Sequence, residues 1–154
     1  MKSFFRYDTT IGEIYIASDG DKIVSLTFGN TSEFKDYNYL ETATIKNAYC
    51  QISEYLQGKR KDFSVPIKLS GTDFQMKVWN ELLKIPYGGT VTYKDIAVGI
   101  NNPKAVRAMG RAIGSNPISI IVPCHRVIGS NRKLVGYAWG LDVKSRLLDI
   151  ERKV

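Results

Sequence analysis

Cys124, His125 and Arg126 place a thiol, an imidazole and a guanidinium at three consecutive positions of the chain. The thiolate form of cysteine is a nucleophile, and a neighbouring imidazole can take the proton of the thiol. His125 is the only histidine in the sequence, so no other imidazole is available as that base. On residue types alone, a thiol hydrolase, a thiol transferase and a structural Cys-His pair all remain open.

A short apolar run, residues 119–122, leads into this triplet and ends at Pro123. The run predicts a buried strand or another buried extended segment. Proline fixes its own backbone and restricts the residue before it. We therefore expect Cys124 to be held rigidly at the end of a packed element.

Three helices are predicted between residue 71 and this segment. The first is expected to begin near Thr72, the second to be capped by Thr92, and the third, residues 104–114, to begin at Pro103. The last two are joined by a Gly/Asn turn, and the second of them is basic. This arrangement suggests a helix-turn-helix, although helix pairs that do not bind DNA share the pattern.

The helix predicted at 104–114 has a small and basic outer surface. Its apolar residues Val106, Met109 and Ile113 fall on one stripe and are expected to face the core. The other side is expected to combine Arg107 and Arg111 with the small residues Ala108, Gly110 and Ala112. Small residues allow a backbone to come close, so this surface suits either a partner such as DNA or a neighbouring helix.

The first half of the chain is predicted to form an α/β unit. Strands at 11–17 and 22–28 are expected to pair as a hairpin, followed by a loop at 31–39 and a helix at 41–56. Cys50 lies on that helix and is expected to be buried as a small apolar residue. A last helix is expected at the other end of the chain, over residues 143–153, with Asp142 as its cap and Glu151 in its final turn.

The net charge of +7 lies entirely in the second half of the chain. Residues 71–154 hold thirteen Lys/Arg and six Asp/Glu, whereas residues 1–70 hold nine of each. This asymmetry favours a polyanionic partner, although a solvated basic surface would show it too. No apolar run approaches the ~20 residues of a membrane span and the N-terminus lacks the features of a signal peptide, so we expect a cytoplasmic protein without membrane contact.

The stretch Pro123-Cys124-His125-Arg126-Val127 resembles the active-site signature of the O6-alkylguanine-DNA alkyltransferases, the methylated-DNA–protein-cysteine methyltransferases. Residues 85–93, 102–108, 116–117, 136–140 and 147–151 follow the pattern of the same family. The strong resemblance covers residues 72–151, and the first half of the chain corresponds more loosely to the family's variable N-terminal domain.

The resemblance implies the fold class and the domains. The class is α/β, with a ribonuclease-H-like α/β domain at residues 1–70. A mostly helical, DNA-binding and methyl-accepting domain follows at residues 71–154, with a helix-turn-helix of winged-helix type. No cofactor is expected. The zinc ligands that some relatives carry in the N-terminal domain are missing from the sequence, so no metal is expected either.

The resemblance also implies a role for each site residue. Cys124 would accept the alkyl group irreversibly, in a single turnover. His125 would deprotonate it through a water, and Glu151 would polarise His125. Asn116 would brace the turn that holds the thiol, and Tyr93 would hydrogen-bond the guanine and help it to leave.

The substrate implied is duplex DNA that carries O6-methylguanine, with O4-methylthymine as a second candidate. The base would be flipped out of the stack and held by Cys124, Val127, Ala138, Ile113, Trp139 and Tyr93. The helix at 104–114 would enter the minor groove, which is only ~6 Å wide and would suit small residues. Arg107 would take the place of the extruded base, and the protein is expected to act as a monomer.

Two other functions remain as alternatives to alkyl transfer. A lesion-sensing or regulatory helix-turn-helix protein would bind DNA without any transfer. A cysteine hydrolase would use Cys124 and His125 over many turnovers and would keep no lasting adduct.

Overall fold

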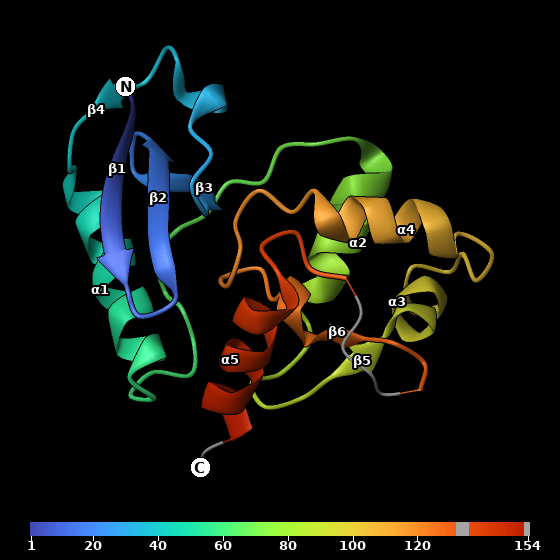
Figure 1. The fold of residues 1–154 in the computed structure, drawn as a ribbon. Helices are drawn as coiled ribbons and strands as arrows, with labels where there is room; N and C mark the ends of the chain where they lie inside the picture. The colour runs from blue at the N-terminus through green and yellow to red at the C-terminus, as the bar shows by residue number, and fades with distance from the viewer. Residues whose placement is uncertain (132–135, 153–154) are drawn as a thin grey trace. The chain divides into compact units, whose positions relative to one another are not determined.

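The chain forms two compact units in the computed structural model, which describes residues 1–131 and 136–152. Unit 1 contains residues 1–69 together with 117–119, and unit 2 contains residues 70–116 and the chain from 120 onward. Figure 1 shows the order of their elements along the chain. None of the helices in the described part of the chain combines the length and the apolar character needed to cross a lipid bilayer.

Unit 1 is built on a four-stranded sheet in the order β3-β2-β1-β4 (Figure 1). β1 (Lys2–Thr9) and β2 (Gly12–Asp19) are antiparallel, with a register that runs from Lys2 opposite Asp19 to Thr9 opposite Gly12. β3 (Lys22–Thr27) extends the antiparallel hairpin, whereas the short β4 (Asn38–Tyr39) runs parallel to β1. The hairpin predicted from the sequence is therefore confirmed as β2 and β3.

The sequence prediction missed β1, because aromatic residues lie on both of its faces. Phe4 stacks on Phe34 with ring centroids 5.0 Å apart, while Phe5 and Tyr7 form an edge contact on the other face at 5.3 Å. Apolar side chains on both faces remove the alternation that marks a half-buried strand. The region predicted as a loop also contains a short 3-10 helix, η1 (Ser32–Phe34), as well as β4.

Helix α1 (Ala43–Leu56) packs on the sheet of unit 1 through Ile45, Ala48, Ile52 and Tyr55, all of them buried. Thr42 caps the helix by accepting a hydrogen bond from the Ile45 N–H at 3.2 Å. The expected burial of Cys50 is wrong: this residue is exposed. Cys50 follows Ala48 by two positions, which places it on the far side of the helix from the buried stripe.

Residues 117–119 belong to unit 1 because they pair with β3. The Leu26 N–H donates to the Pro117 carbonyl at 2.9 Å, and the Ser119 N–H donates back to the Leu26 carbonyl at 3.2 Å. Ile118 forms the corresponding parallel bridge with Leu26. The chain thus adds a short extended segment to this sheet just before it reaches Cys124.

Unit 2 is mostly helical, and its helices are α2 (Asp73–Leu82), α3 (Tyr93–Gly99), α4 (Val106–Gly114) and α5 (Leu141–Arg152). A two-stranded parallel sheet joins β5 (Val91–Thr92) to β6 (Val127–Ile128). Thr72 and Thr92 both form capping boxes, so the predicted helix starts are confirmed at α2 and α3.

Three expectations for α4 are wrong. The helix begins at Val106, not at Pro103, and Val106 is 45% exposed, although it was expected to face the core. Ala112 is only 3% exposed, whereas it was expected on the outer surface. The cause is the contact with α2, where the Trp79 indole N–H donates to the Ala112 carbonyl at 2.8 Å, so the small side chain of Ala112 faces the core.

Helix α5 begins earlier than expected, at Leu141, so Asp142 lies in its first turn and is not its cap. A carboxylate in the first turn still interacts favourably with the helix dipole. Leu147 and Leu148 are buried, as predicted. The sequence also predicts a polar turn over 129–133 and an extended segment over 134–140. Residues 132–135 of these, and the predicted helix end at Lys153, lie outside the described residues.

Candidate active site

The Cys124 segment is buried but is not a regular strand. Every residue from 118 to 129 is buried. Ile120 has a φ of 73°, which costs a β-branched residue about 1–3 kcal/mol, so its surroundings must hold it in place. The Cys124 N–H donates to the Val122 carbonyl at 2.8 Å and closes a tight turn around Pro123, whose φ and ψ of −81° and 64° define an inverse γ-turn.

Asn116 braces this turn. Its side-chain N–H donates to the Val122 carbonyl at 2.8 Å, the same oxygen that accepts from Cys124. Asn116 is itself buried, two residues beyond the end of α4. After the turn, residues Cys124–Arg126 form a short 3-10 helix, η2. The backbone that leads to the Cys124 thiol is therefore fixed at both Val122 and Pro123.

The Cys124 thiol is only 6% exposed. Burial raises the pKa of this thiol, because the thiolate would lose its hydration. Hydrogen bonds from the Asn116 and Tyr137 side chains and the positive charge of Lys144 lower the same pKa. The neutral thiol is thus the resting form, and its reaction needs a proton acceptor.

His125 is completely buried and contacts Glu151 directly, with 2.6 Å between Nε2 and Oε2. Burial lowers the pKa of His125, while the hydrogen bond to Glu151 raises it. The acceptor is a carboxylate, so the proton of the neutral imidazole lies on Nε2. That tautomer leaves the basic lone pair on Nδ1, where it can take a proton.

Arg126 also binds the Glu151 carboxylate, a role that the sequence analysis missed. Its Nε donates to Oε1 at 2.8 Å and its Nη2 to Oε2 at 3.0 Å, both buried. Its Nη1 donates to the carbonyl of Ile85 at 2.8 Å. A two-point contact with a guanidinium keeps Glu151 ionised and fixes the orientation of its carboxylate.

Lys144 is a second residue that the sequence analysis missed. It is 1% exposed, and its ammonium donates to the carbonyls of Val127 at 2.6 Å and Gly136 at 3.0 Å. Burial lowers the pKa of Lys144, and the Cys124 thiolate would raise it. Its spacing from Leu147, Leu148 and Glu151 is that of one helix face, and this pattern could have predicted its burial.

Tyr93 is half-buried at the start of α3. Burial raises the pKa of its phenol, and negative charge on Cys124 raises it further, so the two groups share one electrostatic environment. The hydroxyl also faces Gly136, where an added Cβ would lie 3.4 Å from it. Gly136 has a φ of 60°, so a substitution there would strain the backbone beside the Tyr93 hydroxyl.

The other residues predicted for the site lie on three elements. Val127 pairs with Val91 between β6 and β5, and Ile113 is buried in α4. Ala138 is exposed and Trp139 half-buried, in the segment that leads into α5.

On α4, Arg107 and Arg111 are exposed and Ala108 and Gly110 half-buried, whereas Ala112 contributes to the core. The small and basic surface expected on this helix is present without Ala112. Across the described residues no group of three or more His, Cys, Asp or Glu side chains could hold a metal ion.

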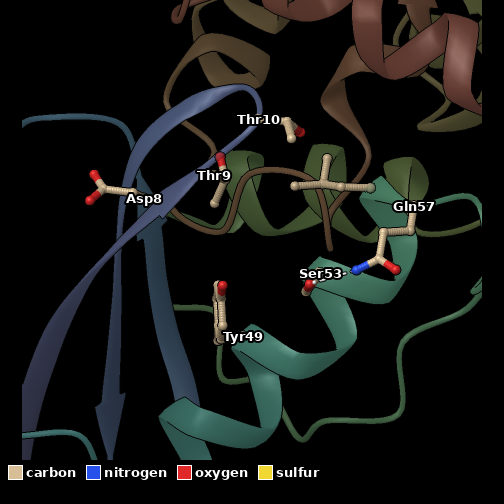
Figure 2. A pocket seen from close by; sticks show the side chains of 7 residues that line it. Asp8, Thr9, Thr10, Tyr49, Ser53 and Gln57 are labelled. Atoms are coloured by element: carbon tan, nitrogen blue, oxygen red, sulfur yellow. Dashed lines mark hydrogen bonds between the residues drawn. The ribbon is translucent and has the colours of Figure 1, made fainter.

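A pocket of about 350 Å³ lies within unit 1, between the end of β1 and the C-terminal half of α1 (Figure 2). It is lined by Asp8, Thr9, Thr10, Tyr49, Ser53, Leu56 and Gln57. None of these residues belongs to the site around Cys124. The Gln57 side chain spans part of its wall by donating to Ser53 Oγ at 3.1 Å (Figure 2).

A buried thiol next in sequence to an imidazole that is hydrogen-bonded to a carboxylate is the arrangement of a cysteine-dependent protein, and the exposed Arg107 and Arg111 on α4 suit an anionic partner such as DNA. Residues 73–153 match the family described as "6-O-methylguanine DNA methyltransferase, DNA binding domain". Residues 5–69 match its "ribonuclease-like domain". The chain belongs to the 6-O-methylguanine DNA methyltransferase family, and both the resemblance and the fold class predicted from the sequence are confirmed.

Similar proteins align over nearly the whole chain. The inducible methylated-DNA–protein-cysteine methyltransferase of Bacillus subtilis is 45% identical over 152 residues, which cover 98% of this chain and 85% of that protein. The methyltransferase of Methanosarcina acetivorans is 47% identical over 148 residues, with 94% and 95% covered. The crystal structure of Mycobacterium tuberculosis OGT in complex with DNA superimposes with a TM-score of 0.92, at 40% identity, covering 97% of this chain and 92% of that one.

Proposed function

We propose that this protein repairs DNA by moving the alkyl group of O6-alkylguanine directly and irreversibly onto Cys124. One observation carries the proposal: a buried thiol, held by Asn116, lies next in sequence to an imidazole that is hydrogen-bonded to an ionised carboxylate. The names of relatives at 45% and 47% identity, methylated-DNA–protein-cysteine methyltransferases, support the same reaction.

Alkyl transfer would begin with the proton of the Cys124 thiol. Through a water, that proton passes to Nδ1 of His125, and the imidazolium so formed is stabilised by Glu151. The thiolate attacks the alkyl carbon, a sulfur–carbon bond forms and the carbon–oxygen bond breaks. The electron pair goes to the guanine, which takes a proton from the Tyr93 hydroxyl and leaves as a neutral base.

The product is a thioether on Cys124, and none of the described residues around Cys124 offers a group that would cleave it. The alkyl carbon of a thioether is a weak electrophile, because its bond to sulfur is weakly polarised and a thiolate leaves less readily than the protonated guanine does. Each molecule therefore acts once, and the protein behaves as a stoichiometric acceptor.

DNA is the partner of this site, and the target base must leave the duplex to reach the buried thiol. Flipping costs a few kcal/mol of stacking and pairing, which protein–DNA contacts must offset. We propose that α4 enters the minor groove with Ala108 and Gly110 toward the backbone, and that Arg107 fills the space of the flipped base. The exposed guanidiniums of Arg107 and Arg111 support this placement.

We further propose that the protein acts as a monomer in the cytoplasm, that its domains are residues 1–70 and 71–154, and that it also acts on O4-methylthymine. The transfer itself can be followed with a duplex that carries a tritium-labelled O6-methyl group. We expect up to one equivalent of label to move to the protein. Binding of the duplex with no label on the protein would support a lesion sensor instead.

A further inference from the structure

We propose that Tyr87 is a positioning residue for alkyl transfer, because its hydroxyl is hydrogen-bonded to the turn of α5 that carries Glu151. The proposal rests on the proposed function and deepens it. It concerns the turn that follows α2, residues 85–88, which the sequence analysis named only as part of a stretch that follows the family's pattern. In the structure this turn contacts the Glu151 carboxylate.

Three contacts tie the turn to the carboxylate and its partner. The Gly88 N–H donates to Glu151 Oε1 at 3.2 Å. The Ile85 carbonyl accepts from Arg126 Nη1 at 2.8 Å, and Arg126 in turn holds both carboxylate oxygens. The Tyr87 ring lies 5.8 Å from the Arg126 guanidinium carbon, within the range of a cation–π contact. The turn therefore contacts Glu151 both directly and through Arg126.

Tyr87 adds a contact to the helix backbone itself. Its hydroxyl donates to the Ile150 carbonyl at 3.3 Å. Ile150 and Glu151 both lie in the last turn of α5 that the structure describes, whose described residues run to Arg152. The Tyr87 hydroxyl thus contacts the backbone of the same turn that carries the Glu151 carboxylate. This contact from outside the helix helps to hold the Glu151 carboxylate in place.

The position of the Glu151 carboxylate matters because His125 and Arg126 both bind it. Oε2 accepts from both Arg126 Nη2 and His125 Nε2, at 3.0 Å and 2.6 Å. A small shift of this turn of α5 would lengthen the contact between Glu151 and His125. The charged and titratable groups around His125 are Glu151, Arg126 and Lys144, and of these only Glu151 favours its protonated form. Loosening Glu151 thus weakens the base that accepts the thiol proton.

The test compares Tyr87→Phe, which removes only the hydroxyl, with Tyr87→Leu, which also removes the ring. Tyr15→Phe is the matched control: it removes a tyrosine hydroxyl that donates to Glu13 in unit 1. The first readout is the single-turnover rate of methyl transfer from an O6-methylguanine duplex, with protein in excess. The second is the NMR signal of the imidazole N–H, which is unambiguous because the chain has one histidine.

We expect Tyr87→Phe to slow transfer by about threefold to tenfold, the size of one net hydrogen bond, and to move the His125 N–H signal toward that of a weaker hydrogen bond. Tyr87→Leu should slow transfer further and move the His125 N–H signal further, whereas Tyr15→Phe should change neither the rate nor the signal. A slower reaction with an unmoved signal overturns the proposal, since the effect would then be general destabilisation. A moved signal with an unchanged rate, or no change in either, overturns it as well. Absence of transfer by the unsubstituted protein would instead contradict the proposed function.

Discussion

Arg126 and Glu151 form a buried ion pair through two parallel hydrogen bonds, of 2.8 Å from Nε to Oε1 and 3.0 Å from Nη2 to Oε2. This pair determines what His125 can do. With Glu151 held ionised, the imidazole must present an N–H to it and keep its lone pair on Nδ1. The acid-base chemistry of Cys124 therefore depends on a guanidinium that has no direct role in the transfer.

The first prediction concerns the stability of this pair. Glu151→Gln leaves the Arg126 charge buried without its counter-charge, so we expect a loss of about 3–5 kcal/mol in the free energy of unfolding. Urea denaturation measures it. The control is Glu54→Gln, whose pair with Arg60 has side chains that are 49% and 31% exposed, and which should lose less than about 1 kcal/mol. Similar losses in the two variants would show that the buried ion pair contributes no more to the free energy of unfolding than the exposed pair does.

The second prediction concerns Lys144 and the thiol. Its positive charge lowers the pKa of Cys124, so Lys144→Met should raise that pKa further and move the pH profile of thiol alkylation to higher pH. The rate of reaction with iodoacetamide, measured against pH by mass spectrometry of the Cys124 peptide, reports this shift. All proteins in the series carry Cys50→Ser, because Cys50 is exposed and would react as well. Lys94→Met, on the surface of α3, is the control and should keep the original profile. A common profile for both variants would rule out the electrostatic role.

The third prediction is a dependence of stability on pH through His125. Burial lowers the pKa of this group in the folded state below its ordinary value of 6.5, so the unfolded chain binds the proton more readily. Its contribution to stability is complete above pH 6.5 and is lost as the pH falls below that value toward the folded pKa. Urea unfolding between about pH 7 and pH 5 should show the decline. His125→Gln should flatten the curve near pH 6, and an equal decline in that variant would contradict the assignment.

The fourth prediction addresses the DNA-binding surface of α4. If Arg111 contacts a phosphate, Arg111→Ala should reduce the slope of log K against log salt concentration by about 0.9. Fluorescence anisotropy with a labelled duplex at several salt concentrations gives the slope. Lys46→Ala, on the exposed side of α1, removes a charge of the same sign and should leave the slope unchanged. A slope that stays the same for Arg111→Ala would place the phosphate contacts on another surface.

The sequence predicted the local features that depend on neighbouring residues. The capping boxes at Thr72 and Thr92 are encoded within four residues, and the hairpin of β2 and β3 within two strands and a turn. The Cys-His pair and the carboxylate of Glu151 were found by resemblance, since 26 positions separate His125 from Glu151 and no local rule joins them.

Features that depend on packing between distant segments were missed. Ala112 became a core residue because Trp79 of α2 bonds to its carbonyl, which helix periodicity alone does not show. Arg126 and Lys144 were passed over because charged residues are almost never fully buried without partners, and their partners lie far along the chain. For Lys144 these partners are two carbonyls, of Val127 and Gly136.

The central claim is that Cys124 itself receives the alkyl group. Intact-mass analysis after mixing the protein with an O6-methylguanine duplex tests it, with peptide mapping to locate the change. We predict a gain of one CH2 unit, stoichiometric and confined to the Cys124 peptide, in the unsubstituted protein and in Cys50→Ser but not in Cys124→Ala. An unchanged mass of the unsubstituted protein, or a gain that persists in Cys124→Ala, would contradict the account.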